Sequence, residues 1–404
     1  MLLGQVGKRM NQYGQYKQAL QNVPKPCAFI DKHFLYENMK AITKRARNKQ
    51  IRIATKSIRS VDMLREILDF SPTFHGLMCF TGEEALYLHD EGFEDLLIAY
   101  PVWNEEILRS ICRRVKDGAI ITVMVDSIAH INRLENIAAE ERGHFLICLD
   151  IDLSTKHYGI HFGVYRSSIR TTKQFTSVLQ CVKQKKRIVL DGIMGYEAQL
   201  AGVPDKDPKQ KIKSSVIRHL KRKSKSEVAA KRKKIMNIMR KSGLSIRFVN
   251  GGGTGSLHQT TQEKVVSEVT VGSGFFYSHL FDKHRSLHFK PAAGFAIEIT
   301  RIPERHVYTC FGGGYVASGP HGEDKVPEIT LPKGAKLMKN EGVGEVQTPV
   351  YYKGPEKLTY GDPIFLRHSK AGELCERFTR LYLVEDGQIV DTYSTYRGDG
   401  KCFL

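Results

Sequence analysis

The sequence lacks the long apolar segments that would direct a chain into or across a membrane. Its longest apolar run, around residues 119–125, is far shorter than the roughly 18 residues that a membrane-spanning helix needs. The first 15 residues contain no apolar stretch of signal-peptide length, and Cys402 stands one place too late for a prenylation motif. We therefore expect neither a membrane anchor nor a leader.

Cysteine is also scarce and scattered. The eight cysteines form no CxxC pair and no tight cluster, which argues against a structural zinc motif and a disulfide framework. Several, such as Cys79 and Cys148, lie in apolar strand-like runs, where a free thiol packs as a small hydrophobic group. A reducing cytoplasm is the simplest compartment.

Basic charge is concentrated in one segment. The chain has a formal net charge of +19, and residues 206–241 hold 15 Lys or Arg against two acidic residues, a net charge of +13. Apolar residues at roughly helical spacing predict one or two surface helices there. Because the segment has no aromatic residue that could stack on bases, we interpret it as a solvated face and do not expect nucleic acid as the main partner. Binding of nucleic acid or another anionic surface is the alternative.

Between about residues 50 and 285, short apolar runs alternate with longer amphipathic runs. This order is typical of βα units and a parallel sheet. Eight such units predict an α/β fold with a closed (β/α)8 barrel of TIM type, and a doubly wound open sheet is the alternative. The predicted strands are 51–56, 75–80, 95–100, 121–126, 145–152, 188–197, 245–252 and 267–274.

Beyond about residue 290 the pattern changes to short alternating strands separated by Gly, Pro and Asp-Gly turns. This predicts a second, all-β domain at the C-terminal end. The predicted domains are residues 1–49, an N-terminal strand and helix that lead into the barrel, 50–285, the barrel, and 286–404, the β domain.

A glycine-rich loop follows the seventh predicted strand, and a Gly-Ser pair ends the eighth. Glycines let backbone N–H groups approach an anion closely, and barrels frequently bind phosphate with the loops after strands 7 and 8. We predict a phosphate site, with a flexible loop as the alternative. Its candidate residues are Gly251, Gly252, Gly253, Thr254, Gly255, Gly272 and Ser273.

Lys56 ends the first predicted strand, where its amine would point into the mouth of the barrel. A partly desolvated amine beside other cations can attack a carbonyl to form a Schiff base. Alone, Lys56 would be interpreted as an ordinary rim lysine. Across the barrel from a phosphate site, it suggests pyridoxal 5'-phosphate, an electron sink for an α-carbanion.

Further polar residues follow the fifth and sixth strands. Tyr196 ends the sixth strand, and the loop after the fifth contains His161 and Arg166. His161 could stay near a cofactor ring, and Arg166 could bind a carboxylate through two hydrogen bonds. Each could equally serve packing or contact solvent.

Together these motifs resemble the pyridoxal-phosphate enzymes with an alanine-racemase-type barrel (fold type III), specifically the D-threonine aldolase and D-serine dehydratase branch. The family's opening pattern is matched from Pro26, with Lys25 in place of its threonine. The resemblance implies that Lys56, behind Arg52 in an R-x-x-x-K stretch, binds the cofactor. It also implies that residues 251–255 bind the phosphate, and that Tyr196 is the aromatic site residue.

The chain departs from this branch in its β domain. The branch usually binds a divalent metal through His-x-Cys or His-x-Asp, whereas here His368 is followed by Lys370, whose ammonium cannot ligate a cation. Cys375 or Glu373 could substitute from a nearby turn, and His368 and Cys375 are the candidate metal ligands. Alternatively, His368 and Lys370 could bind a substrate carboxylate without a metal.

The resemblance implies a lyase that acts on a D-β-hydroxy amino acid, by retro-aldol cleavage or by dehydration and deamination. Lys56, Tyr196 and His368 are the expected catalytic residues. The alternatives are an amino-acid racemase, whose second-base tyrosine we cannot place, a non-catalytic pyridoxal-phosphate-binding regulatory protein, and a nucleic-acid-binding accessory role for residues 206–241. The resemblance also implies a homodimer in which the barrel of one subunit meets the β domain of the other.

Overall fold

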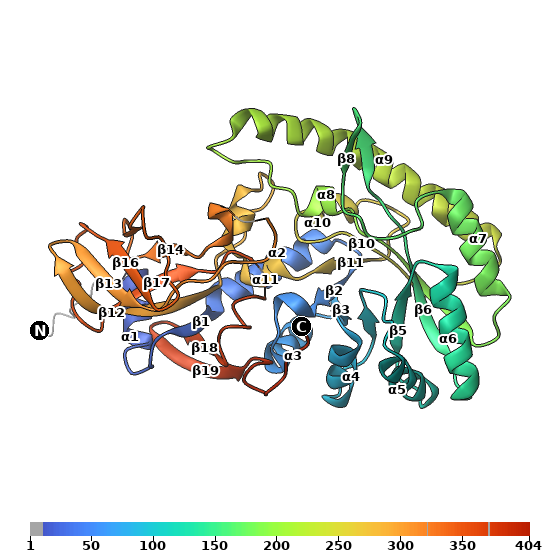
Figure 1. Ribbon diagram of the computed structural model, residues 1–404, viewed down its shortest axis with the longest axis horizontal. Coiled ribbons are helices and arrows are strands. Elements are labelled where there is room, and N and C mark those ends of the chain that lie inside the picture. The colour runs from blue at the N-terminus through green and yellow to red at the C-terminus, as the bar shows by residue number, and fades with distance from the viewer. Residues whose placement is uncertain (1–10, 321, 371) are drawn as a thin grey trace, which may run out of the picture. The chain divides into compact units, whose positions relative to one another are not determined.

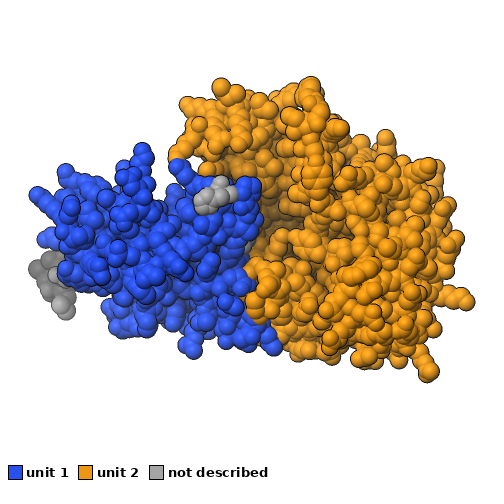
Figure 2. All heavy atoms as spheres, viewed as in Figure 1, with its two compact units in different colours: residues 1–38, 276–280, 290–401 blue, residues 39–275, 281–289, 402–404 orange. Residues whose placement is uncertain are grey.

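The computed structural model describes residues 11–320, 322–370 and 372–404 (Figure 1). The chain forms two compact units, coloured separately in Figure 2. Of the described residues, the smaller unit contains 11–38, 276–280, 290–320, 322–370 and 372–401, and the larger contains 39–275, 281–289 and 402–404. Within the described ranges, no helix is both long enough and apolar enough to cross a membrane.

The larger unit is a closed barrel of eight parallel strands in the order β10, β11, β2, β3, β4, β5, β6, β9. Each of the eight predicted strands overlaps one of them, and the predicted TIM-type barrel is confirmed. Their bounds are β2 Gln50–Ala54, β3 Phe74–Cys79, β4 Leu96–Ile98, β5 Ile121–Val125, β6 Phe145–Asp150, β9 Ile188–Gly195, β10 Phe248–Gly251 and β11 Glu268–Val271.

Helices follow the barrel strands, and local signals set where several of them begin. Ser60, Thr81, Asn104 and Ser127 each accept a backbone N–H from the first turn of the helix that they precede. The helices are α2 Lys32–Ala46, α3 Val61–Phe70, α4 Gly82–Asp90, α5 Glu105–Lys116, α6 Ile128–Glu140, α7 Thr172–Lys183, α8 Ala198–Ala201, α9 Lys211–Lys241, α10 Leu257–Thr260 and α11 Ser273–Phe276.

The basic segment forms one long helix, α9, with 31 residues. Its buried side contains Leu220, Val228 and Ile235, which are at most 9 % exposed. Most of its basic side chains are exposed, although Arg232 is buried and ion-paired. The helix therefore carries its charge mainly on a solvated face.

The smaller unit is built on a nine-stranded sheet. Its main path runs β15-β16-β13-β12-β1-β18-β19, while β17 pairs with β12 and β14. The strands are β1 Cys27–Asp31, β12 Ala293–Glu304, β13 Val307–Phe311, β14 Glu328–Leu331, β15 Lys336–Leu337, β16 Gln347–Tyr351, β17 Pro363–Arg367, β18 Arg380–Glu385 and β19 Gln388–Ser394. The N-terminal strand β1 thus lies inside this sheet, antiparallel to β12 and parallel to β18.

Aromatic packing joins the N-terminal region to this sheet. Helix α1 (Gln12–Ala19) contributes Tyr16, whose ring centroid lies 4.8 Å from that of Phe29 and 5.6 Å from that of Phe365. Phe29 and Phe365 make an edge-to-face contact at 5.7 Å. Residues far apart in the sequence therefore share one apolar core.

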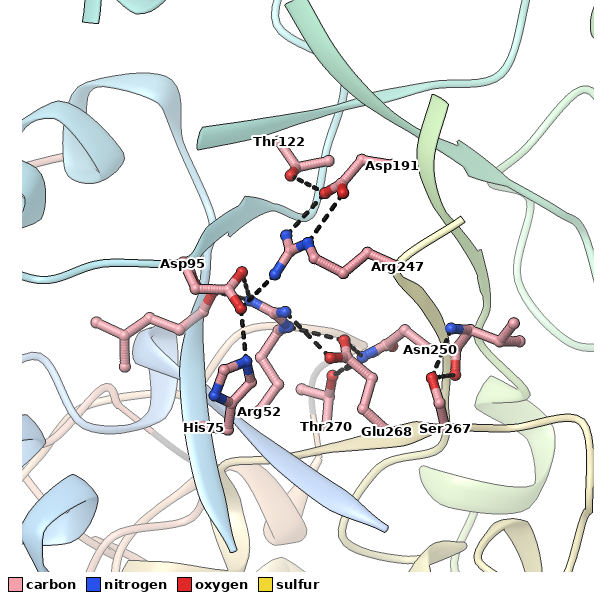
Figure 3. Close-up of polar contacts among 12 residues, drawn as sticks. Arg52, His75, Asp95, Thr122, Asp191, Arg247, Asn250, Ser267, Glu268 and Thr270 are labelled. Carbon is pink, nitrogen blue, oxygen red and sulfur yellow. Dashed lines mark hydrogen bonds and ion pairs between the residues drawn. The ribbon is translucent and has the colours of Figure 1, made fainter. Parts of the chain in front are cut away.

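The amino end of the barrel encloses a network of charged side chains (Figure 3). Arg52 is fully buried, and its guanidinium donates to both carboxylate oxygens of Glu268, at 2.8 and 3.0 Å, and to Asp95 Oδ1 at 3.0 Å. Arg247 bridges Asp95, at 2.5 Å, and Asp191, at 2.7 and 2.9 Å. Burial by itself would raise the pKa of Asp95, but His75, Arg52 and Arg247 lower it well below its usual range.

Candidate active site

Lys56 lies at the carboxyl end of β2, within the short 3-10 helix η1 (Thr55–Ser57). Its side chain is exposed, and its Nζ donates to Tyr100 Oη at 3.4 Å. Tyr100 follows β4, so two strand ends bring these residues together. A primary amine next to a phenol at the mouth of a barrel can serve as a nucleophile that has a proton acceptor in reach.

Arg166 extends the same cluster from the segment after β6. Its Nε donates to Asp150 Oδ2 at 2.9 Å, and its Nη2 donates to the Ala99 carbonyl at 2.6 Å. Its guanidinium carbon lies 4.8 Å from the ring centroid of Tyr100 and 5.9 Å from that of Tyr196. Arg166 therefore links the ends of three strands, β4, β6 and β9.

The protonation of this cluster follows from burial and charge. Burial would raise the pKa of Tyr100, but the charges of Lys56 and Arg166 outweigh it and lower that pKa. Burial raises the pKa of Tyr196 to about 12, so this phenol keeps its proton at neutral pH. Burial also raises the pKa of Asp150 to about 6, although Arg166 opposes the shift.

The glycine loop after β10 is packed too closely for side chains. A Cβ on Gly255 would lie 2.0 Å from the Ala201 carbonyl oxygen, and one on Gly253 would lie 3.2 Å from both the Tyr196 ring and Ala201 Cβ. Gly252 has a φ of 76°, a conformation that side chains disfavour. This loop is therefore a backbone surface against Tyr196.

The end of β11 completes the arrangement. A Cβ on Gly272 would lie 2.5 Å from Ser57 Oγ, so this strand end touches the residue after Lys56. Thr254 Oγ1 accepts the backbone N–H of Gly274 at 3.0 Å, which ties the loop after β10 to the loop after β11. The structure thus joins the predicted phosphate residues to the cluster around Lys56.

Glu197 anchors the glycine loop from behind. It is 1 % exposed and accepts hydrogen bonds from the Gly252 backbone N–H at 3.1 Å, from Ser256 Oγ at 2.9 Å and from the Thr260 hydroxyl. Arg232 of α9 neutralises it, with Nη2 at 2.8 Å from Glu197 Oε2. A buried carboxylate so paired fixes the loop without occupying its open side.

The structure does not place every candidate in this cluster. His161 lies on β8 (Ile160–Phe162), which pairs with β7 (Thr155–His157), and its ring stacks on the exposed Tyr165 with centroids 4.2 Å apart. His368 and Cys375 belong to the smaller unit, and both are fully buried. Roles for these three residues stay predictions.

The surroundings of His368 decide what it can bind. Burial, with the charges of Arg367 and His279, lowers its pKa to about 3, so the imidazole is neutral at pH 7. Two residues on, Lys370 Nζ donates to Ser318 Oγ at 2.8 Å. Across the described ranges, no group of three or more His, Cys, Asp or Glu side chains could hold a metal ion.

Two residues of the site had only a weak signal in the sequence. Tyr100 ends a predicted strand and stands 44 residues from Lys56, and its position after an apolar run is the only hint. Glu197 is visible at the end of the sixth predicted strand, but its partners come from three other segments. Neither contact follows from local spacing.

Residues 30–278 match the family model described as alanine racemase, N-terminal domain. This chain belongs to that family. The match spans the eight barrel strands together with Lys56 and the glycine loop. It confirms the resemblance drawn from the sequence.

Individual relatives of this alanine racemase-type chain include a 3-hydroxy-D-aspartate aldolase of Paracoccus denitrificans (strain Pd 1222). The two are 24% identical over 256 residues, which cover 62% of this chain and 60% of the relative. A second 3-hydroxy-D-aspartate aldolase of Paracoccus denitrificans is 25% identical over 255 residues, with the same shares covered. The chain thus matches about three fifths of the length of these curated relatives.

Solved structures share the whole fold with this family member. The D-threonine aldolase from Filomicrobium marinum superposes with a TM-score of 0.79 at 17% identity, over 94% of this chain and 96% of the other. The D-threo-3-hydroxyaspartate dehydratase from Delftia sp. HT23 gives a TM-score of 0.70 at 15% identity, over 93% and 98%. These likenesses support the fold, a barrel followed by a β domain.

Proposed function

We propose that this protein is a pyridoxal-phosphate-dependent lyase that acts on a D-β-hydroxy amino acid. The observation that carries the proposal is that Lys56 and the glycine-rich strand ends lie close together at the mouth of an alanine racemase-type barrel. The relatives support the substrate class, because they are named as an aldolase and a dehydratase of hydroxylated D-amino acids.

The residues fit pyridoxal 5'-phosphate. Lys56 offers an exposed amine, and the glycine loop has no room for a Cβ at Gly252 or Gly253 because Thr260, Ala201 and Tyr196 pack against it. The N–H groups of these two glycines donate to Glu197 and Ser256, so other backbone N–H groups of the loop would bind the phosphate. When bound, the cofactor supplies an electron sink for negative charge at the substrate α-carbon. Lys56 would hold it, and Arg166 and Tyr196 would orient its ring.

The protein groups also provide for proton movement. Lys56 Nζ must release a proton before it can act as a nucleophile, and Tyr100 Oη lies 3.4 Å away with a lowered pKa. We propose that Tyr100 in its phenolate form accepts this proton at Oη, which leaves a neutral amine on Lys56 and a neutral phenol on Tyr100. Tyr196, whose pKa is raised to about 12, keeps its proton and can donate a hydrogen bond.

A divalent metal fits this chain poorly. The neutral His368 is a suitable ligand, but it lies between Arg367 and Lys370, two cationic neighbours. We therefore propose that turnover needs no metal at His368 and Cys375. Activity that survives a chelator supports this, and activity restored by one divalent ion after chelation contradicts it.

The decisive experiment is a panel of D-β-hydroxy amino acids with the cofactor-loaded protein. Aldehyde and keto-acid products are measured separately, because retro-aldol cleavage releases the first and dehydration with deamination the second. Lys56→Ala is the inactive reference, and Lys116→Ala, an exposed lysine on α5, is the matched control. Interconversion of D- and L-alanine without either product would instead assign a racemase.

We also propose a homodimer, as the family resemblance implies, and a cytoplasmic location, which suits eight free cysteines. Sedimentation analysis measures the first and cell fractionation the second. Mixing Lys56→Ala subunits with His368→Ala subunits tests whether partners share residues. Recovered activity in the mixture supports sharing, and no recovery after proven subunit exchange contradicts it.

A further inference from the structure

A pocket in the larger unit lies beside the C-terminal turn of α2 and the helix α10. Its volume is about 490 Å³, within the range of small-molecule sites. Three of its lining residues carry a permanent positive charge and none is acidic. It is lined by Ala41, Lys44, Arg45, Arg47, His258 and Gln262.

Two of these cations have no counter-charge. Lys44 and Arg47 are exposed, and no carboxylate among the described residues lies within ion-pair distance of either. Other arginines of the same unit are paired, as Arg232 is with Glu197 and Glu263. The pocket therefore concentrates positive charge that the protein leaves uncompensated.

The remaining lining groups are held in place. The Arg45 guanidinium lies over the Phe289 ring, with its carbon 4.6 Å from the centroid. Gln262 Nε2 donates to the His258 carbonyl at 2.9 Å. The His258 Nδ1 is buried without a hydrogen-bond partner among the described residues, so this ring would meet a ligand through its other nitrogen, Nε2.

Two lysines of α9 add to the positive field. Burial lowers the pKa of His258 first, and then Arg45, Lys225 and Lys221 lower it further. Asp205 alone opposes them. An anion in the pocket would relieve this repulsion and raise the pKa of His258.

We propose that this pocket binds the phosphate groups of a small phosphorylated molecule, at a site separate from the glycine loop. Arginine and lysine together favour multiply charged oxyanions, since the planar guanidinium makes paired hydrogen bonds and the ammonium adds a point charge. The apolar Ala41 leaves room beside the cations for an organic part. Binding at this pocket does not depend on the proposed reaction, whereas its coupling to the glycine loop rests on the proposed function.

Helix α10 lines the pocket and also connects to the glycine loop through hydrogen bonds. His258 lies on α10, and Thr260 on the same helix donates to Glu197, the carboxylate that also accepts the Gly252 N–H. A ligand held by His258 is therefore positioned to act on the cofactor loop. Binding at the two sites should be coupled, and the coupling must be reciprocal.

The test is calorimetric titration of the pyridoxal-phosphate-loaded protein, in which the glycine loop is already filled. Pyrophosphate and ADP are titrated separately at low salt. We expect one saturable site, weakened at least about tenfold in Lys44→Gln/Arg47→Gln. Lys116→Gln/Lys186→Gln, which removes two exposed charges elsewhere, should bind like the wild type. In NMR titrations, pyrophosphate should raise the pKa of His258.

Each outcome bears on the proposal. Tighter or equal binding of ADP supports a phosphorylated organic ligand, because the site then accepts the organic part. Much weaker binding of ADP than of pyrophosphate contradicts it and assigns an inorganic anion. Absence of saturable binding at millimolar concentrations, or unchanged binding in the double variant, overturns the site. An oligonucleotide that binds more tightly than both, and loses affinity in Arg222→Gln/Lys233→Gln on the exposed face of α9, would replace it by a polynucleotide surface. None of these binding measurements uses lyase turnover.

Discussion

The two ends of the barrel treat charge in opposite ways. At the amino end, the buried Arg52 and the exposed Arg247 each pair with two of the carboxylates of Asp95, Asp191 and Glu268 (Figure 3). At the carboxyl end, among the described residues, Lys56 has only the Tyr100 phenol within hydrogen-bond reach, and Arg166 has one carboxylate, Asp150. At the amino end, the charged side chains pair with one another across neighbouring strands. At the carboxyl end, the cations of Lys56 and Arg166 have fewer partners and are available to a ligand.

The two ends differ because a buried cation needs more hydrogen-bonding and charged partners than an exposed one. A buried guanidinium without partners would cost several kcal/mol, and Arg52 donates to the carboxylates of Glu268 and Asp95 and to the backbone carbonyls of Leu77 and Asp95. Lys56 is exposed and can leave its amine unneutralised because water solvates it. The carboxyl end also pairs its deeply buried acids Glu197 and Asp150 with cations, Arg232 and Arg166. The reactive amine of Lys56 therefore lies where water stabilises its unpaired charge.

Removing the amine at the carboxyl end should have the largest effect on function. In Lys56→Ala, lyase activity should fall by at least about a thousandfold, because no nucleophile remains to hold the cofactor. Thermal stability should change little, since the side chain is exposed. In the wild type, borohydride should fix the cofactor on Lys56, as peptide mass spectrometry can locate. An adduct on another lysine would contradict the assignment.

Breaking the amino end should do the reverse. Arg52→Met leaves Glu268 and Asp95 buried with fewer partners, and we expect the free energy of unfolding to fall by about 3–5 kcal/mol. Denaturant titration measures it. Arg109→Met, in an exposed ion-pair cluster, is the control and should change stability far less. Equal losses in the two variants would remove the contrast between buried and exposed charge.

Filling the glycine cradle should weaken the cofactor without unfolding the barrel. In Gly253→Val, the new side chain would press on the Tyr196 ring and Ala201, so cofactor affinity should fall by about tenfold or more. Fluorescence titration with pyridoxal 5'-phosphate measures the affinity, and circular dichroism checks the fold. Wild-type affinity in a folded variant would show that the loop does not bind the phosphate.

The smallest expected effect is a change in pH dependence. Because the pKa of Asp150 is raised to about 6, its carboxylate forms as the pH rises through that value. Only the ionised carboxylate pairs with the Arg166 guanidinium. The kcat/KM profile should therefore climb near pH 6 in the wild type and lose this limb in Asp150→Asn. Asp126→Asn, which removes a nearby carboxylate with a lowered pKa, should keep it. A limb that persists in Asp150→Asn belongs to another group.

Much of the barrel could be predicted because its signals are local. Each buried parallel strand is a short apolar run, and each helix after it has an apolar face. The glycines at 251–255 and Lys56 stand at strand ends, where a barrel gathers its chemistry, so their roles could be proposed from position. Spacing along the chain carries all of this information.

The contacts that decide the site are not local. Tyr100 reaches Lys56, and Arg232 reaches Glu197 across 35 residues, because barrel closure brings separate strand ends together. In the sequence, Arg52 stands out only as part of the R-x-x-x-K motif with Lys56, yet its side chain lies in the amino-end network. A strand alternates its side chains between two faces, but its sequence does not record which partners will satisfy them.

The sequence by itself thus determined the barrel, the β domain that follows it, and the candidate lysine and phosphate loop, since periodicity and glycine content are properties of short segments. Only the tertiary structure decided that β1 joins the β sheet, that Glu197 anchors the loop, and that the charges of the two barrel ends differ. The physical reason is that a polar or charged side chain must be paired once it is buried, and which side chains are buried is decided only when distant segments pack together.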